Sequence, residues 1–85
     1  MSNALTLDEY QLKAESTFIV EKNKIEYLAL GLASECGEVC DKLKKAIRDD
    51  ETPLADMEYE KRLEVMKELG DVLWYAAVLA AHMPV

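Results

Sequence analysis

Two short acidic motifs contain the residues of this sequence that are best suited to chemistry. They are Glu35-Cys36-Gly37-Glu38 and Glu68-Leu69-Gly70-Asp71, each with two carboxylates three positions apart. On a helix such a pair lies on one face, about 60° apart, because an α-helix turns about 100° per residue. Four carboxylates from two facing helices would repel one another, and divalent cations that take oxygen ligands, such as Mg²⁺, commonly satisfy such a cluster.

Both acidic pairs border a predicted apolar stripe instead of lying opposite it. The flanking apolar residues are Leu32 and Val39 for the first pair, and Val65 and Val72 for the second. We therefore expect half-buried carboxylates that point toward a cleft between two helices. A single motif of this kind is common by chance on a solvated helix face, but two motifs that both border the core favour a site.

A glycine stands inside each motif. Gly37 and Gly70 each cost their helix about 1 kcal/mol relative to alanine. Their matching positions predict that another group comes close to the backbone at both places.

The elements that must position these motifs are three helices. The first is expected after the capping box Thr6-Leu7-Asp8-Glu9 and should run to about Val20, followed by a polar loop at 21–24. The second is expected at 25–48, where apolar residues alternate steps of three and four. An acidic break then ends at Thr52 and Pro53, which could cap the next turn. The third helix is expected at 57–82, before Pro84.

The fold class predicted is all-α, with three helices per chain that form an oligomeric four-helix-type bundle. A chain of 85 residues is one small domain, and 51% hydrophobic residues is a high fraction for it. Residues 72–81 are apolar on every side of their helix, so they need more cover than two other helices provide. We infer a subunit interface, a missing C-terminal helix, or both, and expect residues 1–5 to be disordered or an expression remnant.

Composition argues against several functions. The formal net charge of −7 disfavours nucleic-acid binding, which needs Lys and Arg to neutralise phosphates. The apolar run at 72–81 is too short to span a membrane. Cys36 and Cys40 lack the partners of a zinc site and are expected to be small buried hydrophobes. With no signal peptide or disulfide framework in the sequence, we expect a cytoplasmic protein.

Two stretches make the sequence recognisable. Residues 30–45, LGLASECGEVCDKLKK, followed by residues 67–75, KELGDVLWY, resemble the MazG-like all-α nucleoside triphosphate pyrophosphohydrolases. The resemblance extends from about Leu7 to about Leu79, and the paired acidic pattern in this context is specific to that superfamily. It implies a single MazG-like domain over residues 1–85.

The resemblance also implies an activity and its metal. Members hydrolyse nucleoside triphosphates, or the deoxy forms, to the monophosphate and pyrophosphate. Glu35, Glu38, Glu68 and Asp71 match the family's Mg²⁺ ligands position by position, with Mn²⁺ as an alternative ion. A water would attack the α-phosphorus, with Glu38 or Glu35 as the catalytic base.

Further residues are candidates for substrate binding. Tyr75 matches a position where related dCTP-hydrolysing enzymes present an aromatic residue to the base. Lys42 and Lys45 lie on the Glu38 side of their helix, where they could meet phosphate oxygens, although a solvated, dipole-matched helix end explains them equally well. Phe18 is expected in the core and could line the base pocket.

The expected partners are a nucleoside triphosphate and further copies of the chain, as a dimer or a dimer of dimers, with neither nucleic acid nor membrane. The leading hypothesis is a house-cleaning enzyme of the nucleotide pool. Two alternatives stay open: a phosphoribosyl-ATP-type pyrophosphohydrolase, and a non-catalytic helical dimerisation module. The sequence leaves base and sugar preference open.

Overall fold

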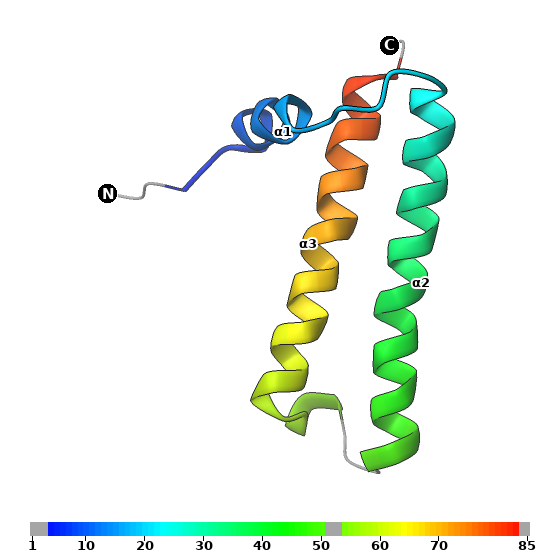
Figure 1. The fold of residues 1–85 in the computed structure, drawn as a ribbon. Helices are drawn as coiled ribbons and strands as arrows, with labels where there is room; N and C mark the ends of the chain where they lie inside the picture. Colours follow the sequence, from blue (N-terminus) through cyan, green and yellow to red (C-terminus); the bar gives the residue numbers. More distant parts are fainter. Residues whose placement is uncertain (1–3, 51–53, 84–85) are drawn as a thin grey trace.

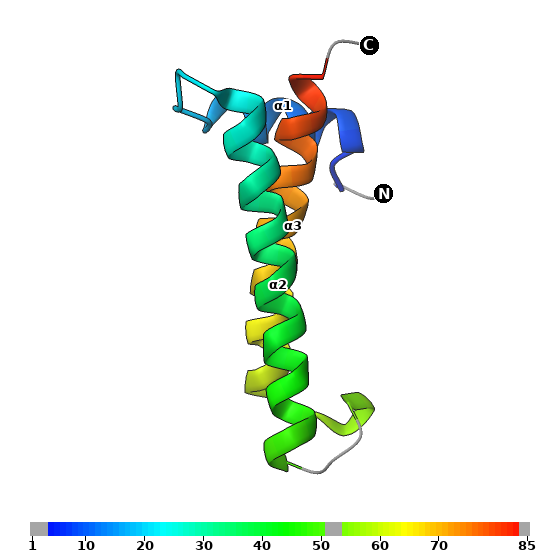
Figure 2. The ribbon, with the colours of Figure 1, turned by 90° about the vertical axis from the view of Figure 1, so that its right-hand side faces the viewer.

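The protein folds as a long helical hairpin with one short helix across its end. A computed structural model describes residues 4–50 and 54–83, and within these ranges every regular element is helical. The elements are α1 (Leu7–Ser16), α2 (Lys24–Asp50), the 3₁₀ turn η1 (Leu54–Asp56) and α3 (Tyr59–Ala81). α2 and α3 lie side by side and run in opposite directions, and α1 packs across the C-terminal part of α3 (Figures 1 and 2). The predicted all-α class with three helices is confirmed.

The start of α1 follows the predicted capping box. The Glu9 backbone N–H donates to Thr6 Oγ1 at 3.1 Å, and the Thr6 N–H donates to Glu9 Oε1 at 3.4 Å. The helix ends at Ser16, four residues before the predicted end at Val20. The hydroxyls of Ser16 and Thr17 donate back to helix carbonyls, and such bonds compete with continued helix.

The long helices begin and end close to the predicted residues. α2 begins directly after Asn23, whose φ of 52° lies in the left-handed region that asparagine tolerates. With 27 residues, α2 is about 40 Å long. α3 begins two residues later than predicted, because the turn η1 precedes it and brings Met57 into a buried position. The predicted roles of Thr52, Pro53 and Pro84 lie outside the described residues, as do residues 1–3.

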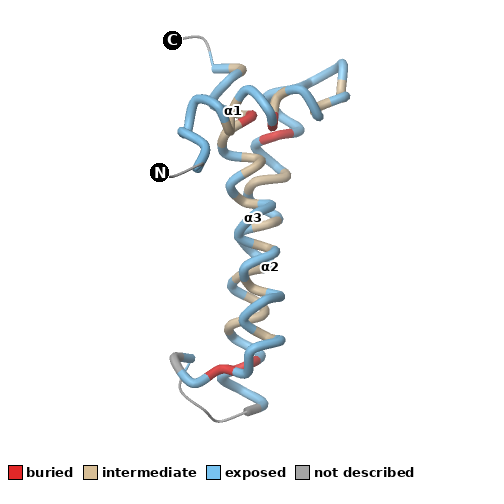
Figure 3. Tube along the Cα trace, turned by 90° about the vertical axis from the view of Figure 1, so that its left-hand side faces the viewer, coloured by how far each residue is buried: buried red, intermediate tan, exposed pale blue. Residues whose placement is uncertain are grey.

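The buried residues lie at the two ends of the hairpin. Ala14, Leu28 and Val78 form the core beneath α1, whereas Ala46 and Met57 are buried at the opposite end. Figure 3 shows exposed and half-buried residues along the middle of the hairpin, where the acidic motifs lie. Only one partner helix covers each long helix there.

Because the middle of the hairpin is covered on one side, one prediction about burial is wrong. Cys36 and Cys40 are exposed rather than buried, because the apolar stripe of α2 is wider than the surface that α3 covers. The apolar part of α3 is likewise covered on one side: Val78 is fully buried, whereas Leu73 keeps 45% of its surface exposed. Among the described residues, no helix has the length and apolar character needed to cross a membrane.

Candidate metal centre

Carboxylates from both long helices meet in the middle of the hairpin. Glu35 of α2 and Glu68 and Asp71 of α3 each offer an oxygen, and these oxygens lie within 4.8 Å of one another. The three-residue spacing of the α3 pair places both acids on the face toward α2. The structure thus brings together three of the four acids singled out in the sequence.

The fourth acid, Glu38, is not among the three residues whose oxygens converge, but its pKa responds to Glu68. Hydrogen bonding to Glu68, followed by repulsion from its charge, raises the pKa of Glu38 above the usual value. Burial, followed by a hydrogen bond with Glu68, raises the pKa of Glu35. With raised pKa values, Glu35 and Glu38 keep their protons to higher pH than a free glutamate does. Glu35 and Glu68 are half-buried as predicted, whereas Glu38 and Asp71 are exposed.

The cluster fits a hard divalent cation. Glu35 Oε2 is buried and has no hydrogen-bond partner among the described residues. A buried carboxylate oxygen without a donor is costly, and a cation would satisfy it. Oxygen donors from several carboxylates are the ligand set that Mg²⁺ and Mn²⁺ prefer. The residues present therefore suit the ion that the sequence analysis expected.

An aromatic pair borders the carboxylates on the side of α1. Tyr75 follows Asp71 by one helical turn, and burial, followed by a hydrogen bond with Tyr27, raises its pKa. The two rings lie 6.5 Å apart between centroids, and Tyr27 keeps 47% of its surface exposed. The negative charges of Glu35 and Asp71 also contribute to the raised pKa of Tyr75. Sequence reasoning missed Tyr27, because its pairing with Tyr75 depends on the register between α2 and α3.

At Gly31 the fold leaves no room for a side chain, and the sequence analysis did not single out this glycine. A Cβ there would lie 2.7 Å from Tyr75 Cδ1 and overlap the ring further along. Among the described residues, nothing lies within 4 Å of a Cβ placed at Gly37 or Gly70, so no described part of this chain approaches the backbone there, and the expectation of a close group stays a prediction. Both glycines are exposed and open to whatever binds from outside.

The other predicted substrate residues lie on opposite sides of the cluster. Phe18 packs against the core as expected, with its ring 6.0 Å from Trp74 and 5.4 Å from His82. Trp74 donates its indole N–H to Thr17 Oγ1 at 3.0 Å, which fixes the chain where α1 ends. Lys42 and Lys45 lie toward the C-terminal end of α2 and line a groove with Glu38.

The fold and the site together define a class: an all-α hairpin in which both long helices supply carboxylates to one acidic cluster. The family model described as MazG nucleotide pyrophosphohydrolase domain matches residues 23–83, and the chain belongs to this family. The expected membership is therefore confirmed. The Gene 37 protein of Mycobacterium phage L5 is 37% identical over 86 residues, which cover 93% of this chain and 73% of that protein. No solved structure matches the chain.

Proposed function

We propose that this protein is an Mg²⁺-dependent hydrolase that cleaves nucleoside triphosphates, or their deoxy forms, to the monophosphate and pyrophosphate. The observation that carries the proposal is the convergence of Glu35, Glu68 and Asp71 in a chain of the MazG family. A house-cleaning role in the nucleotide pool is the use that fits such chemistry.

The residues of the cluster divide into holding and proton-accepting roles. Glu35, Glu68 and Asp71 would hold Mg²⁺, which when bound offsets the charge of the phosphates and makes a water easier to deprotonate. Glu38 is exposed and sits at the mouth of the groove, so its carboxylate can take the proton of the attacking water. The water oxygen forms a bond to the α-phosphorus as the bond from that phosphorus to the bridging oxygen breaks, and pyrophosphate leaves.

The candidate substrate contacts lie on the two sides of the carboxylate cluster along the hairpin. Tyr75, with Phe18 behind Trp74, lies on the side of α1 and suits the base. Lys42 and Lys45 lie on the opposite side of the carboxylates and suit phosphate oxygens. The nucleotide would therefore lie along the hairpin, with its phosphates toward the C-terminal end of α2.

We also propose that the working protein is a dimer or a dimer of dimers. Met66, Leu69 and Leu73 recur at helical spacing on α3, and each exposes 43% or more of its surface. Burial of such a stripe against a second copy would supply the cover that the middle of the hairpin lacks.

Pyrophosphate release from a panel of nucleoside and deoxynucleoside triphosphates with Mg²⁺ tests the activity. We expect release from at least one nucleotide and a loss of about a hundredfold or more in Glu38→Gln. Glu60→Gln, an exposed acid on the first turn of α3, removes the same charge away from the cluster and should keep full activity. Phosphoribosyl-ATP belongs in the panel, since cleavage of that compound alone would assign the substrate. Release from none of the compounds by a folded dimer would favour the non-catalytic module.

A further inference from the structure

A groove extends from the carboxylate cluster toward the turn between α2 and α3. Its volume is about 410 Å³, within the range of pockets that hold small molecules. Glu38 stands at the end nearest the cluster, and Ala46, Met57 and Val65 form an apolar floor. The groove is thus continuous with the site at which the proposed reaction takes place.

Three lysines from two helices line this groove. Lys42 and Lys45 come from α2, and Lys61 comes from α3. By sequence, Lys61 belongs to the polar face of its helix, yet it is half-buried in the structure. The pKa of Asp49 is lowered first by a hydrogen bond from Arg48, and the charges of Arg48 and Lys61 lower it further. Lysines from both α2 and α3 would therefore face an anion in the groove. The alternative explanation, a solvated C-terminal end of α2, would account for lysines on α2 alone.

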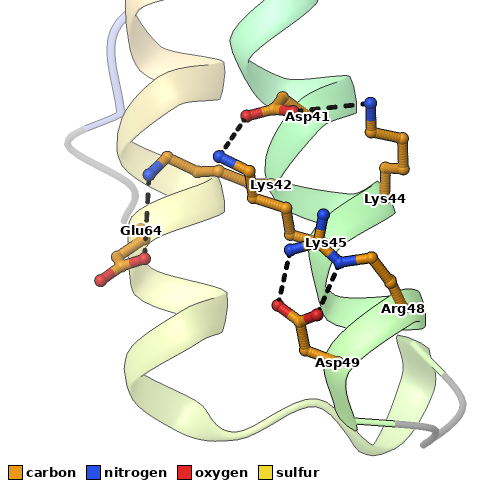
Figure 4. A network of polar contacts seen from close by, with 7 residues as sticks. All are labelled: Asp41, Lys42, Lys44, Lys45, Arg48, Asp49 and Glu64. Carbon is orange, nitrogen blue, oxygen red and sulfur yellow. Dashed lines mark hydrogen bonds and ion pairs between the residues drawn. The ribbon is translucent and has the colours of Figure 1, made fainter.

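Each α2 lysine of the groove is held in an ion pair with a partly exposed carboxylate. Lys42 Nζ lies 3.8 Å from Glu64 Oε2 across the groove, and Lys45 Nζ lies 2.8 Å from Asp41 Oδ2 on its own helix (Figure 4). Exposed pairs of this kind contribute little free energy, whereas phosphate oxygens make charge-assisted hydrogen bonds. A polyphosphate can therefore replace the carboxylates as the partner of these lysines.

We propose that this groove binds the two terminal phosphates of the nucleotide, which leave as pyrophosphate, and that Lys61 is a phosphate ligand supplied by α3. This inference rests on the proposed function and adds the direction of the phosphate chain and a binding residue to it. Four carboxylates also line the groove, namely Glu38, Asp41, Asp49 and Glu64. A divalent cation held by the neighbouring cluster of Glu35, Glu68 and Asp71 would offset part of this negative charge, so binding of pyrophosphate should require Mg²⁺.

Calorimetric titration of inorganic pyrophosphate into the full chain with Mg²⁺ tests the groove without any turnover. Lys61→Gln should weaken binding about tenfold or more, the effect of one lost hydrogen bond to a charged group. Arg62→Gln removes the same charge from the neighbouring exposed residue, which does not line the groove, and should change binding by no more than about twofold. Equal binding by wild type and Lys61→Gln, or no binding by wild type, would overturn the proposal.

A second variant should change the affinity for pyrophosphate in the opposite direction. It also tests the proposal if Lys61→Gln does not fold. Glu64→Gln removes the carboxylate that holds Lys42 and a negative charge from the groove, so pyrophosphate should bind more tightly, by about threefold or more. Unchanged or weaker binding would contradict the proposal.

Steady-state kinetics separate a failure of this inference from a failure of the proposed function. If the chain hydrolyses nucleotides, Lys61→Gln should raise KM for the triphosphate and the inhibition constant of pyrophosphate, while inhibition by the nucleoside monophosphate stays unchanged. If the chain hydrolyses nucleotides but Lys61→Gln does not change KM and inhibition by pyrophosphate in this selective way, the proposal for the groove is contradicted. The proposed activity is then unaffected. Absence of hydrolysis would overturn the activity, and the titration alone would then decide the groove.

Discussion

The carboxylates of the cluster differ in their burial and in the groups that surround them. Glu68 contributes to the raised pKa values of both α2 acids, Glu35 has a buried oxygen without a donor among the described residues, and Glu38 is exposed beside the groove. These differences in environment are the basis of the different roles proposed for the four acids.

The stability of the metal-free protein should fall as pH rises above the ordinary glutamate pKa. Because the pKa values of Glu35 and Glu38 are raised in the fold, the native state keeps protons there that the unfolded chain has released. The resulting stability is present below the unfolded pKa of 4.5 and is lost as pH rises through the raised values. Mg²⁺ replaces these protons, so it should raise the melting temperature more at neutral pH than near the ordinary carboxyl pKa.

Thermal unfolding across this pH range, with and without Mg²⁺, measures the effect. Glu35→Gln should show a smaller fall in the metal-free state, because it cannot titrate at that position. A metal-free melting temperature that rises steadily toward neutral pH in the wild type, and equally in the variant, would contradict the assignment.

Gly31 is required by the ring of Tyr75. Gly31→Ala should lower the free energy of unfolding by about 1–3 kcal/mol, because the added methyl overlaps a ring that Trp74 and Tyr27 hold in place. Gly37→Ala is the matched control: its methyl meets open space, and the better helix propensity should stabilise the helix by up to about 1 kcal/mol. Urea denaturation compares the two, and equal stability of both variants would contradict this account.

At the scale of elements, the hairpin of α2 and α3 forms the site and α1 anchors one end of it. The contacts of α1 are few but specific: Ala14 is buried, and Gln11 Nε2–H donates to the Ala77 carbonyl at 3.0 Å. We therefore expect the stability of α1 to depend strongly on the hydrogen bonds at its two ends.

The N-cap of α1 provides a test at this scale. Thr6→Ala removes the side-chain acceptor of the Glu9 N–H and should cost about 1 kcal/mol, whereas Thr6→Ser keeps the acceptor and most of the stability. Amide hydrogen exchange should show faster exchange confined to α1 in Thr6→Ala. Unchanged exchange there would mean that packing on α3 alone holds the helix.

The sequence was sufficient to predict the features that depend on local spacing. The capping box, the two long helices and the same-face pairs of acids each depend on residues within one or two turns. The partners of Tyr75 and the position of Lys61 depend instead on how α2 and α3 are aligned, which packing between them decides. Periodicity also overestimated burial at Cys36, because an apolar stripe shows which face is hydrophobic but not how many neighbours cover it.

At the scale of the whole molecule, α3 leaves a stripe of apolar residues exposed, and the proposed dimer would bury it. A second copy would cover the stripe of Met66, Leu69 and Leu73. Sedimentation should therefore show a dimer or a larger assembly, and Met66→Lys should shift it toward the monomer, because burying an unpaired charge is costly. Leu12→Lys places the same charge on exposed α1 and should leave the assembly unchanged. A well-folded wild-type monomer would contradict the oligomer.

The position of a bound cation tests the central claim most directly. Crystals of the protein with Mn²⁺ should give an anomalous peak between Glu35, Glu68 and Asp71, and crystals of Glu68→Gln should lose it. Peaks confined to other parts of the surface, or none in the wild type, would contradict the assignment of these carboxylates to a metal centre.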